Sequence, residues 1–338
     1  MAGARSVGRV FGLSCCLTLV LGLYVAGADK AGADAAIQTN VAGAHEIENP
    51  NSPGWYTEPI LLSGDYHHMR LAYDRLAYGM PEVISMNEMC ISQAKNFENW
   101  LNYLWPNQYK TRFGNAFFYG GGPEGACQYY PTPNPAVNGF GNFLAVRANN
   151  YTPWSNGGVV NYNGPFVYGK EYKVWTCMDG GAASVRFTAC TTHFWPADLE
   201  GRATWACTAM PWVRDNLMYP YYNRHSNFVL LGDLYLTRNA PIGGSVAGTI
   251  NGCTVGSMPP PGLLGPWRSN FATGTGPNDN SQTIGIANYQ VDHIITDGSH
   301  NFALGSGFTF KLSNCPNGTT FEQCNLTDHR LVYASPNI

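Results

Sequence analysis

Charged residues are scarce in this chain. Only 12% of its 338 residues are Asp, Glu, Lys or Arg, and 19 basic against 22 acidic residues leave a formal net charge of −3. The broad basic field that many nucleic-acid-binding proteins carry is therefore absent, and any nucleic-acid binding has to depend on a local patch. A polybasic or membrane-lytic function is not supported either.

Long apolar runs are also missing beyond the first 28 residues, so no later stretch is predicted to span a membrane, and no stable membrane insertion is expected. The one long apolar run, Val10–Val25, follows two arginines and precedes the small residues Ala26–Ala28. This pattern predicts a secretory signal peptide over residues 1–28, with a second Ala-Gly-Ala at residues 31–33 as an alternative cleavage site. The predicted localisation is secreted or periplasmic.

No charged linker and no internal repeat divides the remainder of the chain. A hydrophobic content of 44% is ample for a large core, so residues 29–338 are predicted to form a single domain. Residues from about 239 to 287 are rich in Gly, Pro, Ser and Asn, which predicts a surface insertion. No obligate protein partner is indicated.

The chain has no Cys-x-x-Cys pair and no Cys/His cluster, which argues against zinc, the competing interpretation of its cysteines. Two of the ten cysteines lie in the predicted signal peptide. An even number then remains in an exported chain, which favours up to four disulfide bonds. Connectivity does not follow from spacing, but Cys177 and Cys190 flank a predicted hairpin turn, and Cys315 and Cys324 close a small Asn/Gly/Thr-rich loop. The remaining cysteines are Cys90, Cys127, Cys207 and Cys253.

Short segments rich in β-branched and aromatic residues lie between turn signals and predict strands. They cover residues 36–41, 82–86, 142–146, 172–177, 185–190, 228–231, 291–295 and 330–333. Apolar residues at helical spacing predict helices over residues 91–104 and 199–217, the second kinked at Pro211. Strands with interleaved helices favour an α/β or α+β fold over a pure β-sandwich.

Polar residues able to bind a metal or move a proton lie at or beside six of the strands. They are Asn40, Glu88, His193, Asp233, Asp292 and the pair Asp328 and His329. Taken singly, each has a commoner structural role: a turn residue at Asp233, a helix N-terminal charge at Glu88, a core histidine at His193. Taken together, they favour convergence on one rim of the sheet, where loops leave space for a ligand.

In their order along the chain, these motifs resemble those of the endonuclease/exonuclease/phosphatase superfamily, which includes pancreatic-type deoxyribonuclease, apurinic endonucleases, neutral sphingomyelinases and inositol phosphatases. The resemblance covers about residues 35–335 and implies an α+β fold: a four-layer α/β/β/α sandwich of two packed mixed sheets flanked by helices. The segments that carry it are TNVAG, SMNEMC, FGNFLAVR, CTTHF, LLGDLY, VDHII and LTDHRLV.

The resemblance implies a phosphodiester hydrolase that depends on Mg²⁺, with Mn²⁺ or Ca²⁺ as alternatives. Glu88 would be the principal metal ligand and Asp328 an additional one, since carboxylate oxygens suit a hard cation. Asp233 would orient or deprotonate the attacking water, and Asn40 would hold that water or a phosphate oxygen.

The same resemblance implies that Asp292 and His329 form a carboxylate–imidazole pair. His193 would lie on the opposite side of the phosphate as a second donor or leaving-group acid. Arg147, which ends FGNFLAVR, would contact the substrate.

One motif departs from the family, because Tyr235 stands where Gly-Asp-x-Asn has its asparagine. A tyrosine hydroxyl reaches farther than an amide and cannot present two N–H donors. Tyr235 then either substitutes as a substrate-binding residue, stacks on a nucleobase or sugar, or marks a loss of activity.

The predicted function is that of a secreted endonuclease acting on DNA, with RNA also considered, so nucleic acid is the expected partner. Two alternatives stay open: a sphingomyelinase-like phospholipid phosphodiesterase, and a non-catalytic binding module or toxin subunit on the same fold. Tyr219, Tyr221 and Tyr222 precede the Asp233 strand, where they either stack on bases or anchor a loop.

Overall fold

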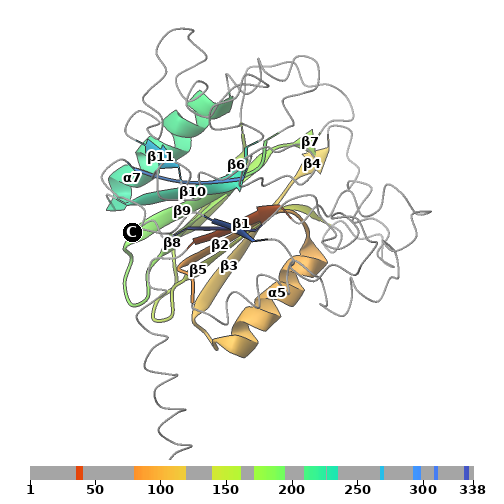
Figure 1. The fold of residues 1–338 in the computed structure, drawn as a ribbon, viewed down its shortest axis with the longest axis vertical. Coiled ribbons are helices and arrows are strands. Elements are labelled where there is room, and N and C mark those ends of the chain that lie inside the picture. The colour runs from red at the N-terminus through yellow and green to blue at the C-terminus, as the bar shows by residue number, and fades with distance from the viewer. Residues whose placement is uncertain are drawn as a thin grey trace, which may run out of the picture.

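Two six-stranded mixed sheets pack face to face in the computed structural model (Figure 1). It describes residues 36–40, 80–118, 139–160, 171–194, 209–225, 227–234, 267–269, 292–297, 308–310 and 331–334. The first sheet has the order β13 (Phe308–Phe310), β14 (Leu331–Ala334), β1 (Ala36–Asn40), β2 (Val83–Cys90), β5 (Phe140–Arg147), β3 (Tyr109–Asn115). The second has the order β11 (Trp267–Ser269), β12 (Asp292–Asp297), β10 (Phe228–Asp233), β9 (Phe187–Thr192), β8 (Val174–Gly180), β6 (Ser155–Val159). A small pairing joins β4 (Phe117–Phe118) and β7 (Glu171–Tyr172).

Helices cover the outer face of each sheet. Helix α5 (Ile91–Leu104) lies against the first sheet, and a helical segment over residues 209–225 lies against the second (Figure 1). That segment includes a π-helical turn, η2 (Arg214–Met218), and ends as α7 (Tyr219–His225). The predicted four-layer α/β/β/α sandwich is confirmed.

Strand alternation produces three apolar layers. In β10, Phe228 and Leu230 face the 209–225 segment, while Val229 and Leu231 face the first sheet. All six residues of β10 are buried, which is why its sequence is an almost unbroken apolar run. The third layer packs the outer face of the first sheet on α5, with Phe97 at 5.6 Å from Phe143 between ring centroids.

The layer between the sheets is apolar at one end and polar at the other. Val83 contributes to the apolar part, whereas Ser85 and Asn87, at the next inward positions of the same strand, make hydrogen bonds to the second sheet. Inward residues of a strand recur at every second position, so the change from apolar to polar side chains can be followed along the sequence of β2. The polar end is where the candidate site lies.

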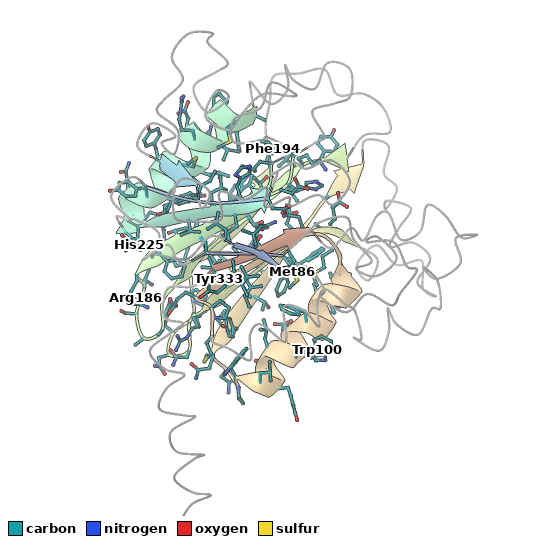
Figure 2. All side chains as sticks on the ribbon, viewed as in Figure 1. Met86, Trp100, Arg186, Phe194, His225 and Tyr333 are labelled. Atoms are coloured by element: carbon teal, nitrogen blue, oxygen red, sulfur yellow. A yellow bond between two sulfur atoms is a disulfide. The ribbon has the colours of Figure 1, made fainter. Side chains whose placement is uncertain are left out.

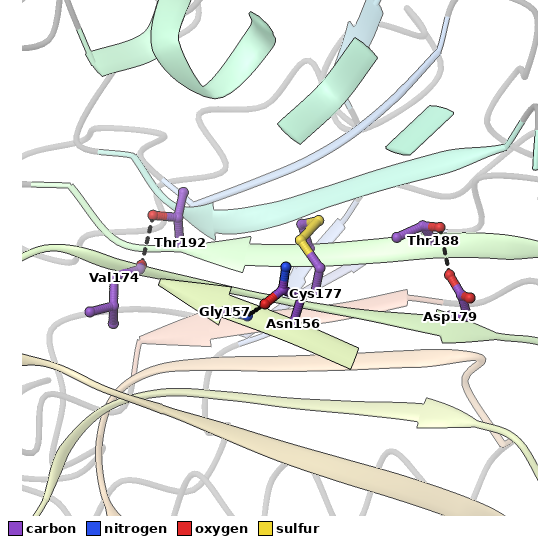
Figure 3. The surroundings of a disulfide bond; sticks show 8 residues. Asn156, Gly157, Val174, Cys177, Asp179, Thr188 and Thr192 are labelled. Atoms are coloured by element: carbon purple, nitrogen blue, oxygen red, sulfur yellow. Dashed lines mark hydrogen bonds between the residues drawn. A yellow bond between two sulfur atoms is a disulfide. The ribbon is translucent and has the colours of Figure 1, made fainter. Parts of the chain in front are cut away.

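The predicted hairpin between Cys177 and Cys190 is present, and a disulfide joins these two directly paired residues of β8 and β9 (Figure 3). Hydrogen bonds lie on either side of it, from Thr188 Oγ1 to Asp179 Oδ1 at 2.8 Å and from Thr192 Oγ1 to the Val174 carbonyl at 3.0 Å (Figure 3). Both cysteines are fully buried. The side chains of the chain's other eight cysteines lie outside the described residues.

Two predicted element boundaries are wrong. The first is that of β2, which continues beyond Met86 to Cys90. Within the predicted insertion, β11 pairs with β12. The second helix continues past Leu217, so the tyrosines after it belong to a helix rather than a loop. The π-helical turn immediately precedes α7. Pro220, which has no N–H to donate, is the second residue of α7. No helix among the described residues is long and apolar enough to span a bilayer.

Candidate active site

The candidate site forms where strands of both sheets end. β1 and β2 run parallel, as do β9 and β10, so the carboxyl ends within each pair lie together. β12 runs antiparallel to β10, which places its first residue, Asp292, directly opposite Asp233. The Phe194 N–H donates to the Asp233 carbonyl at 2.8 Å and links the end of β9 to the end of β10. The predicted convergence on one rim therefore has a structural basis.

A β-bulge in β2 presents Glu88 to this rim. The pairing of β2 with β5 shifts register between Met86 and Met89, and Glu88 has a φ of 54°. Met86 and Met89 both pack toward α5, so the extra residue allows Asn87 and Glu88 together to face the second sheet. Without the bulge, alternation would turn the side chain after Asn87 toward the helix.

His193 lies between a cation and two carboxylates. Its Nε2 is 3.3 Å from Glu88 Oε1 and 3.7 Å from Asp233 Oδ2. On the other side of the ring, Nδ1 is 3.2 Å from Lys173 Nζ. All four side chains are buried, with Asp233 at 0% exposure and Glu88 at 6%. Buried charges of this kind need compensation, and the cluster mixes both signs.

Asn87 connects the two sheets at the centre of the site. Its Oδ1 accepts from Gln38 Nε2 at 2.7 Å and from the Asp233 N–H at 2.8 Å. Its Nδ2 donates to Asn142 Oδ1 at 2.9 Å and to Thr191 Oγ1 at 3.2 Å. Asn87 thereby fixes the backbone that carries Asp233.

Gln38 extends this network to β12. The same Nε2 that bonds Asn87 also lies 3.2 Å from Asp292 Oδ1, so one amide donates to both residues. Asp292 and Asp233 are thus each held, one by its carboxylate and one by its main chain, through a single buried set of hydrogen bonds.

Gly232 is required by the close approach of two strands. A Cβ at this position would lie 2.0 Å from the Thr192 carbonyl oxygen, where no side chain fits. Gly232 therefore lets the end of β10 lie against the end of β9, and Asp233 follows directly. This gives the Gly-Asp pair a packing reason that is independent of chemistry.

The structure brings four of the predicted site residues together: Glu88, His193, Asp233 and Asp292. Asn40 is the last residue of β1 and pairs with Asn87, but its side chain is outside the described part of the chain. Tyr235, Asp328 and His329 lie outside it entirely.

Arg147 does not lie at this rim. It ends β5, which runs antiparallel to β2, so it is beside Glu82 at the start of β2 and far along the strand from Glu88. Its Nη1 is 3.3 Å from Glu82 Oε1, and Arg186 Nη2 is 3.1 Å from the same oxygen. Figure 2 shows Arg186 at one end of the sheets and Phe194 toward the other. The expected substrate contact by Arg147 is not supported by this placement.

Sequence reasoning missed Gln38, Asn87 and Lys173. A usable signal existed for Asn87, because polar residues at the alternate positions 85 and 87 of an apolar strand indicate a polar inward face. Lys173 gave no such signal, since a lysine before a strand is commonly exposed, and here it is 2% exposed.

Only part of a metal centre can be assigned from the described residues. No three His, Cys, Asp or Glu side chains among them are arranged to hold an ion. Glu88 Oε2, however, is buried and has no hydrogen-bond partner within the described structure. A buried, unbonded carboxylate oxygen is a suitable ligand for a hard cation. Glu88 thus fits the metal-binding role that the family resemblance implies, and Asp328 stays a prediction.

No protein-family model and no curated protein matches the sequence. Solved structures do match the fold. The catalytic domain of human Nocturnin, with a bound sulfate anion, superimposes with a TM-score of 0.55 at 12% identity, covering 89% of this chain and 92% of that one. Truncated Caenorhabditis elegans TDP2 gives 0.53 at 10% identity over 89% and 96% of the two chains.

A third match is the endonuclease/exonuclease/phosphatase from Beutenbergia cavernae, with a TM-score of 0.53 at 12% identity over 89% of this chain and 70% of that one. At sequence identities this low, the matches show a shared backbone fold and do not assign a function. The chain has the fold of the endonuclease/exonuclease/phosphatase proteins.

Proposed function

We propose that this chain is a secreted, metal-dependent phosphodiesterase that cleaves DNA. The observation that carries the proposal is that Glu88 and Asp233 each lie within 3.7 Å of His193 Nε2, at a rim to which strands of both sheets contribute. Acidic and imidazole groups concentrated in this way, with an unbonded carboxylate oxygen, are expensive to bury and are typical of catalytic sites.

Each site residue has a separate role in the proposed reaction. Glu88 would hold Mg²⁺, with Asp328 as a further ligand; the bound ion supplies positive charge opposite the phosphate oxygens. Asp233, whose main chain is fixed by Asn87, orients or deprotonates the attacking water. Asp292, held by Gln38, supports His329, and His193 donates to the phosphate group. Asn40 and Tyr235 contact the water or the substrate.

Two features of the comparisons support a phosphate ester as substrate. The Beutenbergia cavernae protein is named for nuclease and phosphatase activities. The human Nocturnin domain carries a bound sulfate anion, which resembles phosphate in shape and charge. The exported location proposed from the signal peptide suits an extracellular nuclease.

Hydrolysis is tested by incubating the purified protein with supercoiled plasmid DNA, RNA, sphingomyelin vesicles and a chromogenic phosphodiester, with Mg²⁺ and with EDTA. Nicking of DNA that EDTA abolishes is expected. The isosteric changes Asp233→Asn and Glu88→Gln should each lower the rate by at least about a hundredfold. Asp215→Asn, on an exposed helical carboxylate that contacts only Arg214 among the interactions the structure gives it, is the matched control and should keep full activity.

Other outcomes separate the alternatives. Turnover of sphingomyelin alone would replace DNA by a phospholipid as substrate. Absence of turnover on all four substrates, with the protein folded, would contradict a hydrolase and favour a binding module.

A further inference from the structure

Lys173 and His193 are brought together by neighbouring strands. Val174, the residue after Lys173, accepts a hydrogen bond through its carbonyl from Thr192, the residue before His193. The Lys173 carbonyl in turn accepts from the Val160 N–H at 2.8 Å. The backbone of this short segment is therefore held by neighbouring strands, and Lys173 Nζ lies 3.2 Å from His193 Nδ1.

The chemistry of the two groups determines the position of the ring proton. A lysine ammonium has three donors and no acceptor, so a hydrogen bond to Nδ1 requires that nitrogen to be unprotonated. The ring N–H is then on Nε2, which lies 3.3 Å from Glu88 Oε1 and 3.7 Å from Asp233 Oδ2. In the opposite tautomer a donor would face the ammonium and a lone pair would face two carboxylates.

We propose that Lys173 is a positioning residue that fixes the tautomer of His193, with its proton on Nε2. His193 is thereby a standing hydrogen-bond donor toward the Glu88 and Asp233 side of the site. The catalytic consequence rests on the proposed function. A ring without a proton on Nδ1 would become an imidazolate if it gave up the Nε2 proton, so His193 donates a hydrogen bond to the phosphate group and does not act as leaving-group acid.

The tautomer is read directly by NMR of protein labelled with ¹⁵N-histidine, at one neutral pH and without substrate. The chain has 8 histidines, and His193→Gln identifies the His193 signals by their loss. The native protein should show a protonated Nε2 and an unprotonated Nδ1. Lys173→Met should shift the ring toward the Nδ1-protonated form, Lys173→Arg should restore the native pattern, and Lys95→Met on the exposed face of α5 should change nothing.

A native ring protonated on Nδ1 would overturn the proposal even if Lys173→Met fails to fold. An unchanged tautomer in folded Lys173→Met would overturn it as well. Because the measurement needs no turnover, these outcomes are distinct from failure of the proposed hydrolase. If DNA is cleaved, Lys173→Met should lower kcat at least tenfold with KM within twofold, and Lys173→Arg should recover most of the loss.

Discussion

Glu88 is the residue at which backbone and side chain are both held in unfavourable states. Its φ of 54° costs a non-glycine residue about 1–2 kcal/mol, because Cβ approaches the following carbonyl oxygen. Its carboxylate is 6% exposed and one of its oxygens has no hydrogen-bond partner among the described residues. Unfavourable states of this kind cluster at functional sites, which is consistent with the proposed role of Glu88 as a metal ligand.

Comparing Glu88→Gly with Glu88→Ala separates the backbone cost from the loss of the carboxylate. Glycine tolerates the left-handed region, so Glu88→Gly should be the more stable of the two by about 1 kcal/mol in urea unfolding. At an ordinary strand position the order reverses, and Val159→Gly against Val159→Ala in β6 is the control. Equal or reversed stability at position 88 would show that the bulge relaxes on substitution. Both Glu88 variants should lack DNA cleavage.

The sequence predicted which residues end the strands but not the direction in which each strand runs or the sheet to which it belongs. Asp233 and His193 could be placed at a rim because a strand pattern ends beside each of them. Arg147 ends a strand too, yet β5 runs against β2, so its end lies at the opposite side of the sheet. Strand direction and sheet membership are set by long-range pairing, which local patterns do not encode.

At the scale of elements, the strands found from sequence are the buried ones. β10 and β12 are rich in apolar and β-branched residues and lie inside the second sheet. The edge strands β3 and β6 were missed, since Lys110 and Arg112 interrupt one and two glycines interrupt the other. Charge and glycine are acceptable at an edge, where one side of the strand lacks a partner.

The Cys177–Cys190 disulfide closes a loop with a sequence separation of 13 inside an already paired hairpin. A loop of this size predicts a stabilisation of about 3 kcal/mol, mostly by restricting the unfolded chain. The double change Cys177→Ala and Cys190→Ala should therefore lower the free energy of unfolding by about that amount while leaving the circular dichroism spectrum unchanged. Thiol reductant added to the wild-type protein should reproduce the loss. A stability unaffected by either treatment would mean that the bond does not form in solution.

At the scale of the whole molecule, the two ends of the sandwich hold different sets of polar groups. The site end gathers carboxylates, a histidine and a lysine, while the other end holds arginines and tyrosines around Glu82 and Asp179. Arg224 reaches Asp179 at 3.0 Å and also lies 4.1 Å above the Trp154 ring. The carboxylates at this end form ion pairs with arginines, which is typical of a structural cluster.

Tyrosines at this second end should make the protein sensitive to alkali. Burial raises the pKa of Tyr109 well above its ordinary value, and burial with nearby Asp179 and Glu82 raises the pKa of Tyr151 to about 12. The unfolded chain loses these protons near pH ~10 while the folded chain keeps them. Stability is therefore intact below about pH 10 and falls as the pH rises through the folded-state pKa values.

Urea unfolding of Tyr109→Phe between pH 9 and about pH 12 tests this. At the low end of this pH range the variant should lose about 1 kcal/mol, because Tyr109 Oη no longer donates to the Pro81 carbonyl at 2.6 Å. Above pH ~10 its stability should fall less steeply than that of the wild type. Tyr103→Phe, at an 80% exposed position, should follow the wild-type curve. Parallel curves for the wild type and Tyr109→Phe would contradict a raised pKa.

The bulge in β2 makes chain length a determinant of the proposed activity. One extra residue between Met86 and Met89 turns Glu88 toward the second sheet, while the positions before and after it keep their places against α5. Deleting either of the two residues that lie there, Asn87 or Glu88, would restore regular pairing with β5 but would also remove one of the two side chains that face the second sheet. Elsewhere in this strand an altered side chain is the main hazard; at this point a change in the number of residues is just as damaging.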